Sequence, residues 1–340
     1  MPIDDRKQRI LLAIVSLYST NAEPIGSNLL SQYFDMAVSS ATLRNEMAAL
    51  TRLGLLEQPH TSAGRVPTSK GYRYYVDHLL RLPTRLQEED RLALSRIFQT
   101  LDHDPEKLAQ GAAAVFAELL KYAVVTTTPR AEDMRIAHFE VLQVGRFTAA
   151  VLAVTNAGGV RTRVARVDFE LDEEGVSHVA KMLNRSLRFV AEMDVTPRDI
   201  SSLVDSLGEG GSRYWPILSA SLTLLSEVGT PSVYVEGHKN LLLWPELEPA
   251  LHTVMELFTS PKELEEILRP TSAGTSVLFG DELKKPVPEL CIITCPYLAG
   301  GGRTGIIAVG GPSRMEMWDV IPKLEYFSEL LGKAMSDPAA

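Results

Sequence analysis

The segment from Ser39 to Leu53 constrains the fold most, because it is amphipathic at a helical spacing and its polar face carries no acid. Leu43, Met47 and Leu50 recur on one side of a helix and predict a buried face. Ser39 or Ser40 is suited to cap the N-terminus. Glu46 lies on the shoulder, and the opposite face carries small, amide and basic side chains: Ala41, Arg44, Asn45, Ala48 and Arg52. Arg and Asn read the edges of guanine and adenine, so this helix is a candidate for contacting DNA.

Two earlier helices and a tight connection are predicted before this segment. Helical spacing runs from Asp4 to about Thr20, and the stretch from Asn21 to Gly26 contains Pro24 and breaks it. Ser27 can cap a second helix, and its predicted buried stripe is Leu29, Leu30, Tyr33 and Phe34. With a turn from Asp35 to Val38, the three helices describe a helix-turn-helix. An ordinary three-helix core whose polar face meets only water has the same pattern, so the helices alone leave both interpretations open.

The residues after the third helix predict a β-hairpin. Gly54 ends the helix, Leu55 to Glu57 begins a strand, and the chain turns within Pro59 to Gly64 before extending again at Arg65. Such a hairpin is a wing, and its tip offers His60, Thr61, Ser62 and Arg65 to phosphates or the minor groove. A further helix from Thr68 brings Lys70, Tyr72 and Arg73 within reach of the DNA backbone. We expect Tyr74 and Tyr75 to pack against the wing.

Three sequence runs in this region resemble the heat-inducible transcription repressor HrcA family. They are Ser39-Ser40-Ala41-Thr42-Leu43-Arg44-Asn45-Glu46-Met47, Thr61-Ser62-Ala63-Gly64-Arg65-Val66-Pro67-Thr68 and Lys70-Gly71-Tyr72-Arg73-Tyr74-Tyr75-Val76. Near the C-terminus, Gly310-Gly311-Pro312-Ser313-Arg314-Met315 is similar to a Gly-Pro-Thr-Arg-Met stretch of that family, with Ser313 in place of the threonine. The resemblance is weakest between about 170 and 235.

The rest of the chain alternates between helical and extended patterns. We expect helices from Leu86 to about Ala123, strands between Ile136 and Phe169, and helices again from Asp172 to Val228. Further strands are predicted at 232–236, 276–280, 290–296 and 305–309, with helices at 246–268 and 317–335. The fold class is therefore multidomain α+β. The resemblance implies a winged helix at 1–82, a GAF-like domain at 83–160 and 236–340, and an inserted α/β dimerisation domain at 161–235.

Charge divides the chain unevenly. The net charge is −9 overall, but residues 1–82 carry +2 and the remainder −11. A mildly basic head on an acidic body suits a DNA-binding module whose other domains stay off the DNA. Two cysteines fit a reducing, cytoplasmic compartment, and no apolar run is long enough to span a membrane. A signal peptide is the competing interpretation of the N-terminus, but Asp4 and Asp5 stand where basic residues are needed.

The sequence offers no constellation of catalytic or metal-binding residues. Gly300 to Gly305 lacks the Gly-Lys-Ser/Thr ending of a phosphate-binding loop and is better explained as a hairpin turn. Cys291 and Cys295 would share one face of a strand about 13 Å apart, too far for a disulfide. The seven histidines are scattered. We therefore expect no enzymatic activity, no cofactor and no metal.

The leading hypothesis is a dimeric repressor that binds an inverted-repeat operator, and the resemblance implies that this operator is CIRCE, upstream of chaperone operons. It also implies that GroE chaperonin keeps the repressor active. Expected DNA contacts are Ser39, Ser40, Ala41, Thr42, Arg44, Asn45, Arg52, His60, Thr61, Ser62, Arg65, Lys70, Tyr72 and Arg73. One alternative is a regulator whose GAF-like domain senses a metabolite. The other is an enzyme or chaperone-associated factor whose N-terminal domain binds protein.

Overall fold

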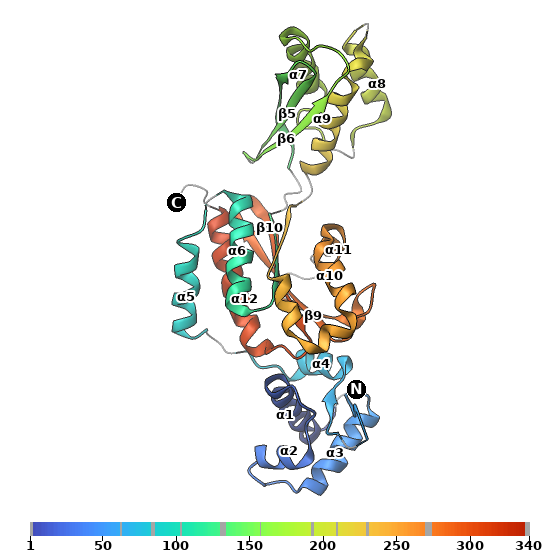
Figure 1. Cartoon of the computed structure of the whole chain (residues 1–340). Coiled ribbons are helices and arrows are strands. Elements are labelled where there is room, and N and C mark those ends of the chain that lie inside the picture. The colour runs from blue at the N-terminus through green and yellow to red at the C-terminus, as the bar shows by residue number, and fades with distance from the viewer. Residues whose placement is uncertain are drawn as a thin grey trace. The chain divides into compact units, whose positions relative to one another are not determined.

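The computed structural model describes residues 3–61, 63–82, 86–102, 104–129, 134–156, 158–191, 194–208, 210–228, 231–268 and 274–336. The chain forms two compact units (Figure 1). Unit 1 comprises residues 1–128 and 233–340, and unit 2 comprises residues 129–232. Unit 1 contains the N-terminal helices and a larger α/β part, which we call the body (residues 86–128 and 233–336).

The N-terminal part of unit 1 is a winged helix. Its helices are α1 (Asp5–Asn21), α2 (Ser27–Tyr33), α3 (Ser40–Arg52) and α4 (Ser69–Tyr74), and α4 continues as a π-helical turn, Tyr75–Leu79. Strands β1 (Leu56–Glu57) and β2 (Val66–Pro67) pair antiparallel to form the wing. Asp4 caps α1 by accepting a hydrogen bond from the backbone N–H of Lys7, at 2.9 Å. The three helices and the hairpin predicted from the sequence are confirmed.

A five-stranded antiparallel sheet forms the centre of the body, in the order β7-β3-β10-β9-β8. Its strands are β3 (Ala123–Thr127), β7 (Val233–Glu236), β8 (Ser276–Phe279), β9 (Leu290–Ala299) and β10 (Arg303–Pro312). The glycine-rich turn Gly300–Gly302 joins β9 to β10 as predicted, and both cysteines are buried on β9. Strand β3 was missed: we expected helix up to Ala123, yet this short β-branched run lies between β7 and β10.

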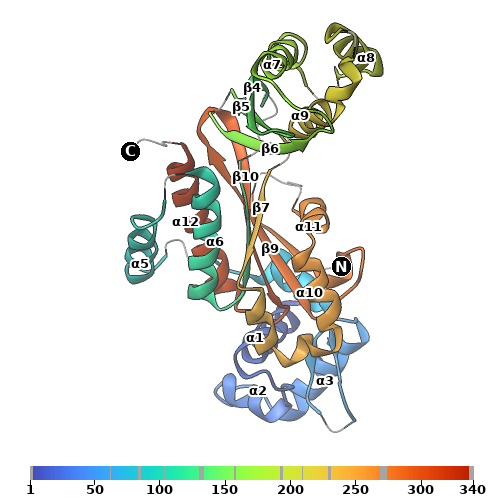
Figure 2. The same ribbon diagram turned by 45° about the horizontal axis from the view of Figure 1, so that its top comes forward.

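Helices cover both faces of this sheet (Figures 1 and 2). One face packs against α6 (Pro105–Leu120) and α12 (Met317–Ser336), with α5 (Glu88–Phe98) outside them. The other face packs against α10 (Leu251–Thr259) and α11 (Pro261–Ile267), which follow the short 3₁₀ turns His238–Leu243 and Pro245–Ala250. The Phe258 ring of α10 lies so close to Gly310 that a Cβ there would come within 2.2 Å of it. Side chains therefore fill the space between α10 and the sheet.

Unit 2 is a three-stranded antiparallel sheet, β4-β5-β6, with helices on one face. The strands are β4 (Ile136–Gly145), β5 (Thr148–Thr155) and β6 (Val160–Arg166); the helices are α7 (Glu173–Leu187), α8 (Pro197–Ser206) and α9 (Trp215–Val228). Because β5 pairs with β4 and β6 along its length, the three strands form one structural unit. The insertion therefore spans 129–232 and includes β4 and β5, whereas we placed its start at 161 and assigned 83–160 to the GAF-like domain.

Among the described residues of unit 2, no helix packs on the outer face of this sheet, and that face is largely apolar. Leu142, Val160 and Val164 are exposed, and Val164 retains 68% of its accessible surface. Register places Leu142, Ala150 and Val164 in one row across the three strands. An exposed apolar sheet face of this kind is unusual on an isolated domain and marks an interaction surface.

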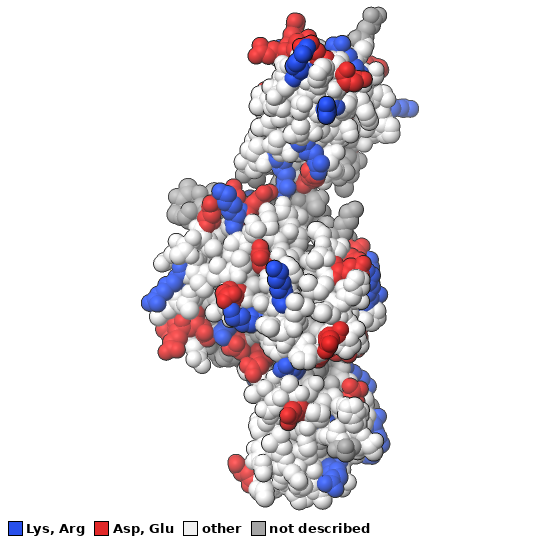
Figure 3. Space-filling view, viewed as in Figure 1, with Lys and Arg blue, Asp and Glu red and all other residues white. Residues whose placement is uncertain are grey.

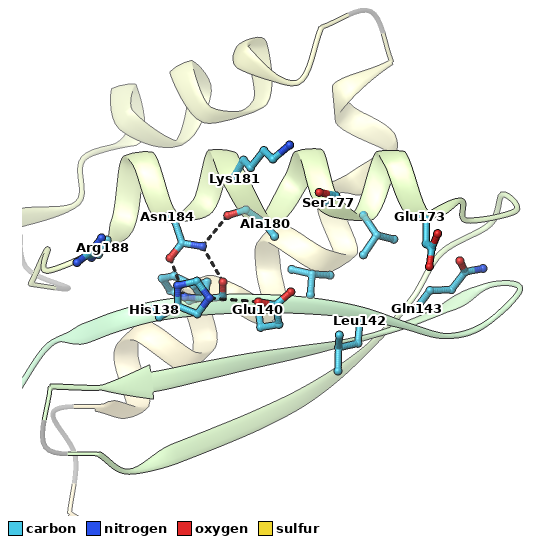
Figure 4. Close-up of a pocket in the computed structure, with 13 residues that line it drawn as sticks. His138, Glu140, Leu142, Gln143, Glu173, Ser177, Ala180, Lys181, Asn184 and Arg188 are labelled. Carbon is cyan, nitrogen blue, oxygen red and sulfur yellow. Dashed lines mark hydrogen bonds and ion pairs between the residues drawn. The ribbon is translucent and has the colours of Figure 1, made fainter.

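Strand β4 is an edge strand, and an open groove of about 880 Å³ separates it from α7 (Figure 4). The Asn184 side chain spans this groove: its Oδ1 accepts from the backbone N–H of Phe139 at 2.8 Å, and its Nδ2 donates to the Phe139 carbonyl at 2.6 Å. The Asn184 side chain of α7 thus makes the two hydrogen bonds that a neighbouring strand would make to Phe139.

Candidate nucleic-acid interface

Helix α3 is held by a cap and by a buried face that agree with the sequence pattern. The Ser39 hydroxyl accepts from the backbone N–H of Thr42 at 3.2 Å, which satisfies one of the free N–H groups at the helix start. Leu43, Met47 and Leu50 are buried against the other helices. The cap and the buried stripe together fix which side of α3 faces outward.

The outward side of α3 is basic and open. Ala41, Arg44, Asn45 and Arg52 are exposed, while Ser40 and Thr42 are half-buried near the N-terminus. Within the described residues, neither Arg44 nor Arg52 has an ion pair. These guanidinium groups are therefore available to phosphates or to base edges.

The one acid of α3 is neutralised by α1. The Glu46 carboxylate lies 3.2 Å from Lys7 Nζ and 3.8 Å from Arg6 Nη1. The hydrogen bonds that the Lys7 ammonium donates to Asp4 and Glu46 raise its pKa. This pairing was not predicted, because it depends on how α1 crosses α3. It keeps a negative charge away from the outward face.

The connection from α2 to α3 is strained and exposes apolar side chains. Asp35 and Met36 are consecutive non-glycine residues with positive φ, 49° and 60°, a conformation that costs about 1–2 kcal/mol per residue. Met36 is 74% exposed, and Leu29 and Tyr33 are exposed as well. The prediction that Leu29 and Tyr33 are buried is wrong: α2 has only seven residues and buries just the side that carries Leu30. Tyr33 and Met36 lie before α3 and were not among the expected contacts.

The wing is ordered by hydrogen bonds at its base and near its tip. Arg65 exchanges two backbone hydrogen bonds of 2.9 Å with Ile25, and Arg65 Nε donates to the Thr51 hydroxyl of α3 at 3.1 Å. The Gln58 amide donates to the Thr61 and Ala63 carbonyls. Gly64 is required because a Cβ there would lie 2.4 Å from the Ile25 backbone. His60 and Thr61 are exposed, and Ser62 lies outside the described residues.

Helix α4 contributes one exposed cation and two side chains that face elsewhere. Lys70 is exposed, and its Nζ donates to the Leu53 carbonyl just after α3, at 2.9 Å. Tyr72 is 4% exposed and stacks on Phe279 of the body, and its burial raises the pKa of the phenol. Arg73 is engaged by Glu282 of the body. The structure thus brings the α3, wing and Lys70 residues together and places Tyr72 and Arg73 against the body, while Tyr75 is buried.

The winged helix and the body differ in how many acidic side chains they expose in Figure 3. In the view of Figure 3, acidic side chains gather over the body, where α5 begins with Glu88, Glu89 and Asp90. On the winged helix they are few and scattered. On the face seen in Figure 3, the winged helix therefore repels a polyanion less than the body does.

Two family models match the chain, one at its N-terminal winged helix and one over the residues that follow. Residues 3–78 match the model described as the winged helix-turn-helix transcription repressor, HrcA DNA-binding domain. Residues 106–321 match the model described as the HrcA protein C-terminal domain. The chain belongs to the HrcA family. HrcA proteins are winged-helix transcription repressors, so the DNA-binding interpretation of the N-terminal domain is confirmed over that of an ordinary three-helix core.

Curated relatives match over nearly the whole chain. The heat-inducible transcription repressors HrcA of Desulforudis audaxviator and Brevibacillus brevis are each 32% identical, covering 98% of both chains. That of Clostridium perfringens is 33% identical over 94% of this chain and 95% of its own. The expected role in repressing heat-shock transcription is thereby confirmed.

One solved structure supports the fold. The crystal structure of a hypothetical protein at 2.2 Å resolution superposes with a TM-score of 0.60 and 24% identity, covering 99% of this chain and 100% of that one. The expected order, a winged helix followed by a mixed helix and sheet part, is confirmed. Among the described residues, no helix is both long and apolar enough to cross a membrane.

Proposed function

We propose that this HrcA protein represses chaperone operons by binding the CIRCE inverted repeat as a homodimer. The observation that carries the proposal is the outward face of α3, where Arg44 and Arg52 have no ion pair within the described residues and Glu46 is turned away. Ser40, Ala41, Arg44 and Asn45 read base edges in the major groove. Its action is cytoplasmic, and we assign it no enzymatic activity.

Contacts to phosphates come from around α3. His60, Arg65 and Lys70 bind phosphates, with Ser39, Thr42, Arg52 and Thr61 at the margin of the same surface. Tyr72 and Arg73 are left out because one is buried and the other is held by a carboxylate. The assignment predicts that Arg44 and Asn45 set sequence preference, whereas the phosphate contacts set salt dependence.

Dimerisation follows from the size of the DNA contact and from unit 2. A single winged helix buries only about 600–1,000 Å² of protein surface on DNA, so useful affinity needs two copies on an inverted repeat. The bare sheet face with Leu142, Val160 and Val164 is suited to pair with its own copy in a second chain. We expect Val164→Asp to convert a dimer into a monomer in sedimentation, while Lys181→Asp, at an exposed position of α7 that lines the groove, leaves the dimer intact.

Dependence on GroE chaperonin is the second part of the proposal. When other clients occupy the chaperonin during heat stress, less repressor remains folded and the operons are transcribed. In this scheme the conformational stability of the repressor is the switch.

A gel shift at fixed salt tests the proposal. The protein is titrated onto a CIRCE-type repeat and onto a scrambled duplex of equal length and composition, each with and without GroE chaperonin. We expect preferential binding to the repeat, strengthened by chaperonin. Equal binding of both duplexes by folded protein would refute the operator assignment, and an unchanged affinity with chaperonin would refute the chaperonin dependence.

A further inference from the structure

Two arginine side chains attach the winged helix to the body, and they reach in opposite directions. Arg73 extends from α4 to the body, and Arg314 extends from the turn after β10 to the winged helix. We call their contact region the joint: Ser19, Tyr72 and Arg73 on the winged helix, and Glu246, Glu282 and Arg314 on the body. One continuous apolar cluster crosses it, since winged-helix and body side chains belong to the same core.

The first of these arginines is fully engaged. Arg73 Nη2 lies 2.8 and 2.6 Å from the two Glu282 carboxylate oxygens and 2.7 Å from the carbonyl of Val277 in β8. Its guanidinium carbon lies 4.9 Å from the centre of the Phe279 ring. Glu282 is itself held, because its Oε2 accepts from the Phe279 N–H at 2.9 Å. A charged, multiply bonded contact of this kind restricts orientation more than apolar contact does.

The second arginine closes the other side of the joint. Arg314 pairs with Glu246, donates to the Ser19 carbonyl in the last turn of α1 at 3.2 Å, and lies 4.7 Å from the Trp244 ring centre. A cation at a helix C-terminus is favoured by the helix dipole. Only 14% of the accessible surface of the Arg314 side chain is exposed to solvent. It therefore ties the end of α1 to the body from within the fold.

Some neutral polar groups at the joint are buried without a hydrogen-bond partner among the described residues. Three buried side-chain atoms lack a hydrogen-bond partner within the described residues: Ser19 Oγ, Tyr72 Oη and Trp244 Nε1. Ser19 and Tyr72 belong to the joint, and Trp244 lies directly under Arg314. The unpartnered groups weaken the contact, and the two arginine pairs supply its charged, directional bonds.

We propose that Glu282 and Arg314 are positioning residues that fix the orientation of α3 on the body and so set the half-site spacing that the HrcA dimer accepts. The inference rests on the proposed function. A dimer reads both half-sites only if its two recognition helices are separated by the distance between major grooves. With a rigid attachment, the second recognition helix has a high effective concentration at the second half-site for one spacing only. With a loose attachment, this effective concentration is lower and is similar for many spacings.

The test measures affinity for repeats whose central spacer is lengthened or shortened by up to about half a helical turn, roughly five base pairs. A single half-site duplex measures the recognition surface by itself. The wild type should prefer one spacer. Arg314→Gln and Glu282→Gln, as separate variants, should bind the half-site within about twofold of wild type, while their preference among spacers falls by about tenfold.

Two further variants separate positioning from a general loss of structure. Arg314→Lys keeps a cation near the Ser19 carbonyl and should restore most of the spacer preference. Tyr72→Phe alters the same joint without touching either arginine pair and should keep the full preference. Loss of half-site binding in parallel with repeat binding, in both Gln variants, would show a structural role only and overturn the inference.

The failures of the two proposals are distinguishable. If the wild type binds repeats of every spacing alike, or if both Gln variants keep the wild-type preference, the joint does not set spacing and the repressor function stands. If the wild type binds scrambled duplex as well as any repeat, the proposed operator recognition fails, and the inference built on it fails as well.

Discussion

Arginine has opposite roles at two places in this protein. On α3, Arg44 and Arg52 are exposed and have no ion pair in the described part of the chain. At the joint, Arg73 and Arg314 are each bound to a carboxylate and a backbone carbonyl. We therefore infer that the same side chain serves DNA binding where it is exposed and domain attachment where it is paired. For Arg73, the role is decided by its partner Glu282, which lies more than 200 residues away in the sequence.

The largest effect that separates the two regions should come from Arg314→Ala. Removing the guanidinium leaves Glu246 poorly solvated and unpaired, so the free energy of unfolding should fall by about 3 kcal/mol. Urea unfolding followed by tryptophan fluorescence measures it. Arg198→Ala, on the exposed surface of α8, is the matched control and should change stability by less than about 0.5 kcal/mol. Equal effects of the two substitutions would contradict the structural role of Arg314.

Arg44→Ala should show the converse behaviour. We expect operator affinity to fall by about thirtyfold, or about 2 kcal/mol, because a bidentate contact to a base edge is lost. The urea midpoint should not move, since the side chain has no ion pair to lose among the residues that the structure describes. Fluorescence anisotropy with labelled operator gives the affinity. A stability loss comparable to that of Arg314→Ala would remove the distinction between the regions.

The salt dependence of binding should distinguish basic residues that contact phosphates from basic residues that face the body. Lys70→Ala is expected to reduce the slope of log affinity against log salt by about one, because one phosphate contact is lost. Arg73→Ala should leave that slope unchanged, since Arg73 faces the body. A reduced slope in Arg73→Ala would instead return this residue to the DNA contact surface.

The smallest effect concerns two buried tyrosines. The Tyr297 hydroxyl donates to the Thr127 carbonyl inside the body, so Tyr297→Phe should lower the free energy of unfolding by about 1 kcal/mol. The Tyr72 hydroxyl has no hydrogen-bond partner in the described part of the chain, so Tyr72→Phe should cost nothing or stabilise the protein slightly. The difference between the two thermal midpoints checks this, and a larger loss for Tyr72→Phe would show that its hydroxyl is bonded in solution.

Local patterns predicted the elements well, because caps, breaks and periodic apolar residues act over a few positions. Ser39 as a cap, the buried stripe of α3 and the wing all follow from neighbouring residues. The pairings between distant segments did not follow. Arg73 resembled a phosphate contact because its partner Glu282 lies in another part of the chain. Strand β3 is too short to be told from the end of a helix by periodicity, although Val124 to Thr127 is β-branched throughout. The insertion boundary was misplaced because only strand pairing shows that β4 and β5 belong with β6.

Asn184 has a consequence for the behaviour of HrcA chains at high concentration. An edge strand with free peptide groups invites further strands, and this is a common route to aggregation. Here the Phe139 peptide is already bonded on both its N–H and its carbonyl by a side chain from the same unit. A foreign strand adding along β4 must displace that amide, so unit 2 resists polymerising through its edge while its bare apolar face stays available for one specific partner.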